Sequence, residues 1–153
     1  MTTAESDLPL IDHEPRVDDL ASEVCDALAR SPRQLPSKFF YDQRGSELFD
    51  QICELDEYYL TRTELAIMQA HGPAMAQCIG RDALLVELGS GSSIKTRLLL
   101  DQLETPAGYV PIDISRGHLL ASAHQLARAY PRLEILPVCA DYTQPFTLPA
   151  PRK

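Results

Sequence analysis

The stretch LLVELGSGSSIK, Leu84–Lys95, decides how this chain folds. A short apolar run that carries one acid ends in a turn of glycines and serines. The pattern TRLLLDQL at 96–103 follows at once, with its leucines at helical spacing. A buried strand that runs through a tight glycine turn into a helix N-terminus is typical of α/β proteins that bind nucleotide-like ligands. Glycines let the backbone approach the ligand, and free amides at the helix start favour negative or polar oxygens.

After Gly80, strand and helix patterns alternate regularly. The apolar runs predict strands and the amphipathic stretches between them predict helices: strands 83–88, 108–113 and 133–139, and helices 94–103 and 116–129. This order implies parallel strands joined by right-handed helical crossovers. The sequence therefore predicts an α/β fold with a βαβαβ core.

The residues before Gly80 have a helical texture. Residues 1–16 are polar and contain two prolines, so we expect them to fray or to wrap the surface. Apolar residues recur at helical spacing over 17–30, and a second, short amphipathic helix is expected from about Ser46. The predicted layout is a helical N-terminal segment followed by the βαβαβ core.

The segment EYYLTRTE is predicted to begin the third helix of this N-terminal part. Thr61 is the expected N-cap, because Glu64 stands three residues later and completes a capping-box pattern. A disturbance of the helix is expected at Gly72–Pro73. Tyr58 and Tyr59 precede the helix, and two interpretations stay open for them: core packing, or a pocket lined by tyrosine hydroxyls.

Composition narrows the class of protein. The chain has 153 residues, 44% of them apolar, which fits one domain with a core. Its formal charge of −8 argues against nucleic acid as the main partner, since phosphate binding needs a basic face. The 4 cysteines lie far apart, with no CxxC pair, which indicates reduced thiols and no metal site. Without a signal-peptide core or a membrane-spanning apolar run, the chain is expected to be cytoplasmic, with no membrane contact.

Two phosphate-binding motifs compete for the glycine turn. GSGSSIKT at Gly89–Thr96 nearly matches the phosphate loop GxxxxGK[ST], but Ile94 stands where the second glycine belongs. A β-branched residue there obstructs the left-handed backbone that wraps the phosphates. The same turn lacks the third glycine of the dinucleotide fingerprint GxGxxG. Both motifs are therefore weakened, and a nucleotide-binding phosphate loop stays as an alternative.

Polar groups also follow the second and third predicted strands. Asp113 ends the second strand, where an acid accepts hydrogen bonds from both ribose hydroxyls of an adenosine. Ser115 suits the N-cap of the next helix better, which leaves Asp113 to face the cleft. Asp141 and Tyr142 end the third strand and suit an adenine, the acid accepting its amine and the ring lying alongside. These strand ends meet at one sheet edge.

Other aromatic and basic residues are expected to be structural. Phe39, Phe40 and Tyr41 form a cluster that is more typical of a core than of a site. His118 and His124 lie in the second crossover helix, where we expect them to be solvated. No Ser/His/Asp or Cys/His arrangement is recognisable in the sequence, so no catalytic residue is assigned.

These motifs together resemble the histidine-specific, S-adenosylmethionine-dependent methyltransferases, which make hercynine for ergothioneine biosynthesis. LPSKFFYDQRGSELFDQICELDEYYLTRTE at 35–64 is similar to the family's N-terminal signature. VELGSGSSIKTRLLLDQL, YVPIDIS and CADYT are similar to its cofactor motifs, in the same order and at matching spacing. The resemblance implies a Rossmann-like class I methyltransferase fold and methyl transfer from S-adenosylmethionine to the α-amino group of histidine.

The resemblance also implies roles for single residues. By motif position, the cofactor contacts are expected to be Gly89, Lys95, Asp113, Asp141 and Tyr142. On the same basis Tyr58 is expected to contact the amino-acid substrate, and Tyr41 to lie close to it. The family usually has proline in place of Leu60 and commonly phenylalanine in place of Tyr142.

Family members are considerably longer than this chain. On the resemblance, 1–79 is a helical segment that contributes to the substrate domain, 80–143 is the first half of the cofactor domain, and 144–153 is a tail or a break. Strand 83–88 would then have an open edge where another strand of the family's sheet belongs, and such an edge invites self-association. We therefore expect a truncated form with little activity by itself. A non-catalytic interaction module that uses this edge stays as an alternative.

Overall fold

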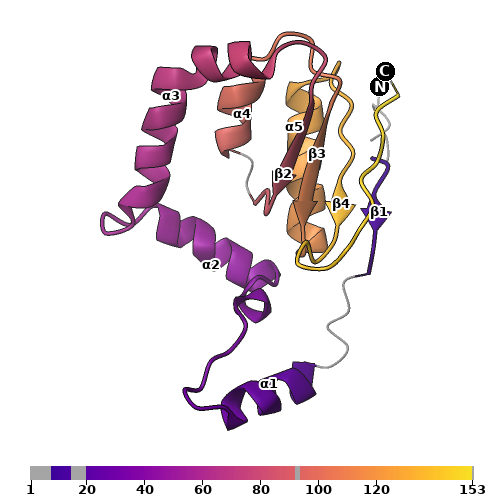
Figure 1. Ribbon diagram of the computed structural model, residues 1–153. Coiled ribbons are helices and arrows are strands. Elements are labelled where there is room, and N and C mark those ends of the chain that lie inside the picture. Colours follow the sequence, from indigo (N-terminus) through magenta and orange to yellow (C-terminus); the bar gives the residue numbers. More distant parts are fainter. Residues whose placement is uncertain (1–7, 15–19, 92–93, 153) are drawn as a thin grey trace, which may run out of the picture.

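A parallel sheet organises the molecule. Within residues 8–14, 20–91 and 94–152, which this computed structural model describes, 4 strands pair in the order β1–β4–β3–β2 (Figure 1). β2 (Leu84–Leu88) pairs along its whole length with β3 (Gly108–Asp113), and β3 pairs with β4 (Val138–Cys139). All these pairings are parallel, which confirms the predicted βαβαβ order.

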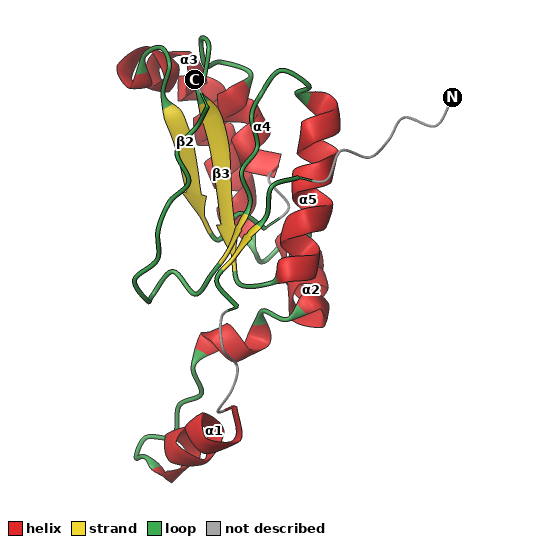
Figure 2. Ribbon diagram, turned by 90° about the vertical axis from the view of Figure 1, so that its right-hand side faces the viewer, coloured by secondary structure: helices red, strands yellow, loops and turns green. Residues whose placement is uncertain are grey.

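The core lies around β3, the most buried strand. Tyr109 packs on one face of the sheet with Leu100 and Leu126, which belong to α4 (Ile94–Leu100) and α5 (Arg116–Ala129). Val110 and Ile112 pack on the other face with residues of the β4 segment and with Phe146 of the C-terminal tail. The two crossover helices therefore cover the same face, and Figure 2 shows α5 running alongside the strands.

The sheet differs from the prediction in the length of its last strand and in an added edge strand. Only Val138–Cys139 of the predicted strand 133–139 is regular, and Ile135 makes an isolated bridge to Tyr109. Pro111 of β3 interrupts the ladder, because it faces β4 between Tyr109 and Asp113 and has no N–H to donate. Beyond β4, Ile11–Asp12 forms β1, an edge strand in parallel pairing. The expectation that this part of the N-terminus frays or merely wraps the surface was wrong.

Between β1 and β2, the described residues form three helices and a short 3₁₀ turn: α1 (Leu20–Ala29), η1 (Ser37–Phe40), α2 (Gln43–Cys53) and α3 (Tyr59–Ile79). α2 begins three residues before the predicted Ser46, because Asp42 caps it by accepting a hydrogen bond from the Gly45 amide at 2.7 Å. Position 45 requires glycine, because the start of α2 lies close to the end of η1: a Cβ on Gly45 would lie 1.7 Å from the Phe40 carbonyl oxygen.

α3 departs from the predicted boundaries. It begins at Tyr59, so Thr61 lies inside the first turn and the predicted capping box does not form. Arg62 instead donates to the carbonyl oxygens of Leu55 and Asp56, at 2.8 and 2.6 Å, and ties the helix to the loop before it. The helix continues through Pro73 to Ile79, where packing against α4 supports it. α4 in turn ends at Leu100, three residues before the predicted end.

The sheet ends at β2. Its free edge confirms the predicted open edge of strand 83–88 within the described residues, and Val86 and Leu88 are exposed there. Among the helices of the described ranges, none is long and apolar enough to cross a membrane.

Candidate functional site

A cavity of about 420 Å³ lies at the carboxyl ends of β2, β3 and β4. Ligands of open parallel sheets bind at this edge. The sheet side and the helical N-terminal side both line it: Ser37, Tyr41, Ser46, Phe49, Asp50, Leu88, Gly89, Gly91, Lys95, Asp113, Ile114, His118, Ala140, Asp141, Tyr142 and Thr143. Six of the seven predicted site residues are among them.

A larger cavity lies at the opposite end of the sheet. Its volume is about 790 Å³, and most of its lining is apolar, including Leu100, Pro106 and Leu133. None of the predicted site residues line it. The acid in its lining is Asp82, just before β2, whose carboxylate accepts a hydrogen bond from the Thr105 hydroxyl at 3.1 Å. The smaller cavity is therefore the better candidate, since polar groups converge there.

The turn after β2 is built by glycine conformations and by β3. Gly89 and Gly91 have φ angles of 68° and 48°, in the left-handed region that glycine adopts without strain. The amides of Gly89 and Ser90 both donate to the Ile112 carbonyl, at 2.8 and 3.1 Å, so the turn folds back onto β3. The backbone of the turn thus forms one wall of the cavity without side chains in the way.

Glu87, the acid before this turn, has a structural role. Its carboxylate accepts hydrogen bonds from the hydroxyls of Thr96 in α4 and Tyr109 in β3. It joins β2 to its neighbouring elements and is not among the residues that line the cavity.

Asp113 is more engaged than the sequence suggested. Its Oδ2 accepts from the Gly91 amide at 3.2 Å and its Oδ1 from the Ser115 amide at 2.9 Å. Ser115 is the N-cap of α5, as predicted, but its side chain makes no capping bond. The bond from the Ser115 amide to Asp113 closes a two-residue turn before the helix and is not a helix cap. A carboxylate has about four acceptor sites, so Asp113 keeps capacity for hydroxyl groups of a ligand while its orientation is fixed.

Asp141 and Tyr142 lie on the loop after β4. Asp141 accepts from both the amide and the hydroxyl of Thr143, and the turn is thereby closed. Tyr142 is half exposed, and its hydroxyl would lie 3.8 Å from a Cβ placed on Gly89. The ring therefore spans from the third strand end to the glycine turn, across the mouth of the cavity.

Lys95 lines the cavity from α4, but its ammonium already has a partner. The Nζ atom lies 2.9 Å from Oε2 of Glu64 on α3, and both side chains are about half exposed. Glu64, expected to complete a capping box, thus joins α3 to α4 instead. The pair places one positive charge at the rim of a cavity that is otherwise rich in carboxylates.

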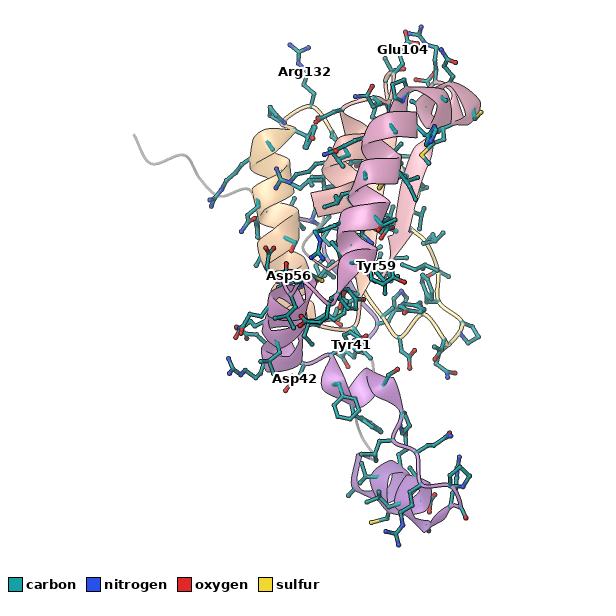
Figure 3. The ribbon with its side chains drawn as sticks, turned by 90° about the vertical axis from the view of Figure 1, so that its left-hand side faces the viewer. Tyr41, Asp42, Asp56, Tyr59, Glu104 and Arg132 are labelled. Carbon is teal, nitrogen blue, oxygen red and sulfur yellow. The ribbon has the colours of Figure 1, made fainter. Side chains whose placement is uncertain are left out.

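An aromatic row forms the helical wall. Tyr41 packs edge-on against Phe49 with ring centroids 6.3 Å apart, and Phe49 packs edge-on against Tyr58 at 5.9 Å. Tyr41 and Phe49 line the cavity, whereas Tyr58 does not. Figure 3 shows Tyr41 where η1 leads into α2, and Tyr59 at the start of α3. The prediction that Phe40 and Tyr41 belong to the core was wrong, because these residues are 59% and 42% exposed.

His118 and Asp50 were missed as cavity residues. His118 was expected to be solvated, yet its side chain is only 16% exposed and its Nε2 lies 3.5 Å from Oδ2 of Asp50 on α2. No local pattern marks this position: the residue four places on, Ser122, is polar, and its burial on the same face of α5 shows only in the fold.

Cys139 is close to the cavity but is not a nucleophile. Burial raises the pKa of this thiol to about 11, and the Asp12 carboxylate adds to the effect. The thiol is therefore protonated at neutral pH, and its Sγ lies 3.7 Å from the Ile114 carbonyl oxygen. Across the described ranges, no group of three or more His, Cys, Asp or Glu side chains is arranged to hold a metal ion.

Comparison with known proteins agrees with this geometry. The family described as "Histidine-specific methyltransferase, SAM-dependent" matches residues 20–153. The chain is 44% identical over 131 residues to the histidine N-alpha-methyltransferase of Mycobacterium tuberculosis, which covers 84% of this chain and 40% of that protein. It is 42% identical over 128 residues to the protein of the same name from Mycolicibacterium smegmatis, covering 82% of this chain and 40% of that protein.

A fungal protein shows the same similarity over a shorter stretch. The chain is 43% identical over 91 residues to ergothioneine biosynthesis protein 1 of Neurospora crassa, which covers 58% of this chain and 10% of that protein. The chain thus spans about 40% of the length of the two mycobacterial relatives and a smaller part of the fungal one.

Proposed function

The chain belongs to the family of histidine-specific, SAM-dependent methyltransferases, and we propose that it serves methyl transfer from S-adenosylmethionine to the α-amino group of histidine, the formation of hercynine for ergothioneine. One observation carries the proposal: the glycine turn, Asp113 and the Asp141 loop converge on one cavity with an aromatic wall opposite them. The names of the relatives from Mycobacterium tuberculosis and Neurospora crassa support it.

The sheet side of the cavity fits the cofactor. A side chain is absent at Gly89 and Gly91, where the backbone would lie against the ligand, and Asp113 has acceptor capacity for the ribose hydroxyls. We assign the adenine to Asp141 and Tyr142, which stand at the third strand end. S-adenosylmethionine supplies, when bound, a methyl group already activated on a sulfonium sulfur.

Lys95 is assigned to the cofactor as well. The cofactor carries a carboxylate, and the Lys95 ammonium is the positive charge at the rim of the cavity among three lining aspartates, Asp50, Asp113 and Asp141. Its ion pair with Glu64 holds the ammonium in place at that rim. The Glu64 carboxylate competes only weakly with the carboxylate of the cofactor for this ammonium, since half-exposed ion pairs contribute about 0–1 kcal/mol.

The aromatic wall is assigned to the substrate. We propose that Tyr41 borders the histidine and that the Tyr58 hydroxyl helps to orient its amino group, with Phe49 packed between the two rings. The amine must be neutral to react, and a free α-amino group titrates near ~8. The residues described here bind, orient and exclude water, and positioning of this kind supplies much of the rate of a transfer reaction.

The first experiment is a calorimetric titration of the chain with S-adenosylhomocysteine. We expect Asp113→Ala to weaken binding by at least about tenfold, because it removes an acceptor aimed into the cavity and the anchor of the glycine turn. Asp56→Ala, in the exposed loop before α3, is the matched control and is expected to bind as the wild type does. Equal affinity of both variants would contradict the assigned site; absence of binding by the folded wild-type chain would contradict the proposal for this chain.

Two alternatives from the sequence lead to different results. A phosphate-loop protein would bind a nucleoside triphosphate with magnesium, and the family membership of the chain argues against it. An interaction module would use the open edge of β2, where Val86 and Leu88 are exposed. Concentration-dependent association without S-adenosylhomocysteine binding would favour that second function. For the compartment of the protein we propose the cytoplasm.

A further inference from the structure

The two walls of the cavity are joined by one pair of titratable side chains. Asp50 belongs to α2, on the helical side, and His118 belongs to the first turns of α5, on the sheet side. The His118 Nε2 and the Asp50 Oδ2 lie 3.5 Å apart, and both residues line the cavity. The pair therefore lies between the cofactor side and the aromatic wall.

α2 packs against α5 at this point. Ser46 of α2 is buried, and the Gln43 side chain of α2 lies next to Gly117 of α5, its Oε1 in ordinary contact range, 3.7 Å, of a Cβ placed on that glycine. The position of α2 over the sheet thus depends on its contact with α5. Since Phe49 stands on α2 one residue before Asp50, a shift of this contact moves the aromatic wall.

Other charged groups face the same space. Asp113 at the end of β3, Asp141 after β4 and Lys95 on α4 all line the cavity with His118. Asp113 is held by two backbone amides and Lys95 by Glu64. Asp50 is the carboxylate within salt-bridge distance of the imidazole.

We propose that His118 is a positioning residue: its imidazolium form pairs with Asp50, holds α2 against α5, and thereby sets the aromatic wall over the cofactor site. The inference rests on the proposed function of the cavity. Only the imidazolium carries the charge that attracts the Asp50 carboxylate, and the separation of 3.5 Å is that of an ion pair and not of a short hydrogen bond. Histidines change charge between pH 5 and 8, so cofactor affinity is expected to decrease over this range.

A double-mutant cycle tests the pair without any ligand. Asp50→Asn and His118→Gln keep size and hydrogen-bonding capacity but remove the charges, and urea unfolding of the wild type, both single variants and the double variant gives their coupling. At pH 6 we expect a coupling of about two- to fivefold in the unfolding equilibrium constant, the range of partly exposed ion pairs. At pH 8 the coupling should fall towards one. Absence of coupling at pH 6 would overturn the proposal.

The second measurement is the affinity of the cavity for a ligand at two pH values. Calorimetry with S-adenosylhomocysteine at pH 6 and pH 8 should show about two- to fivefold tighter binding to the wild type at pH 6. His118→Gln should bind equally at both values, whereas His124→Gln, a histidine of the same helix outside the cavity lining, should keep the wild-type dependence. A pH dependence that survives in His118→Gln would overturn the positioning role.

The two measurements also separate this inference from the proposed function. If the wild type binds no S-adenosylhomocysteine but the coupling is present, the cofactor assignment fails and the pairing of α2 with α5 stands. If the ligand binds and the coupling is present, but affinity is the same at pH 6 and pH 8, then the pair does not position the cavity and the inference is wrong.

Discussion

The two sides of the cavity are held in different ways. The sheet side is fixed by backbone hydrogen bonds, such as those from Gly89 and Ser90 to Ile112, and by a core whose strand β3 is buried. The helical side rests on edge-on aromatic contacts, and Tyr41 and Phe49 remain partly exposed. This difference implies a rigid cofactor site facing a wall that is easier to displace. Four predictions test it.

The largest expected effect is loss of core packing in β3. Ile112 is fully buried, and Ile112→Ala should lower the free energy of unfolding by about 2–5 kcal/mol. Phe49→Ala should cost less, about 1–2 kcal/mol, because that ring is 38% exposed. Urea unfolding of both variants provides the comparison. Equal losses would mean that the wall is as tightly packed as the sheet.

The second effect concerns the start of the wall. A Cβ on Gly45 would lie 1.7 Å from the Phe40 carbonyl oxygen, so Gly45→Ala forces η1 and α2 apart. We expect a loss of about 1–3 kcal/mol, although alanine is the better helix former. Gly117→Ala is the control, since its Cβ would meet Gln43 at an ordinary 3.7 Å. A neutral Gly45→Ala would show that the contact between η1 and α2 adjusts easily.

These two regions also differ in how far the sequence predicts them. The parallel order was predicted, because alternating apolar runs and a glycine turn are local signals. The open edge of β2 was expected only from the resemblance to a family of longer proteins. The wall was predicted less well. The second helix was expected to begin only at Ser46, whereas Gly45 lies inside α2 and makes a close approach to Phe40 that only the folded structure shows. Thr61 matched a capping pattern, but Arg62 anchors the helix start instead.

Long-range contacts explain the remaining differences. β1 is only two residues long and pairs with β4, more than a hundred positions away, which no local pattern reveals. His118 faces Asp50 because α2 packs on α5, again a tertiary feature. The predicted cofactor residues do line one cavity, since strand ends of a parallel sheet meet at one edge. Tyr58, the predicted substrate contact, does not line the cavity but packs against Phe49, which does.

A third, smaller effect concerns the cap of α2. Asp42 accepts from the Gly45 amide at 2.7 Å, and Asp42→Ala should cost about 1 kcal/mol in the free energy of unfolding. Asp42→Asn keeps an acceptor and should recover most of that loss. If helix capping and the aromatic wall are coupled, the alanine variant will also weaken S-adenosylhomocysteine binding, measured by calorimetry. If the regions are independent, only stability will change.

The smallest effect on stability is expected at Lys95, where the two regions meet. Its pair with Glu64 is about half exposed on both sides, so Lys95→Gln should change the free energy of unfolding by less than about 1 kcal/mol. Affinity for S-adenosylhomocysteine separates two roles of the ammonium. If it contacts the ligand, Lys95→Gln weakens binding more than Glu64→Gln does, because the second variant leaves the positive charge in place. If both variants weaken binding equally, Lys95 acts only by joining α4 to α3, and the cofactor site depends on the helical side more than its backbone hydrogen bonds suggest.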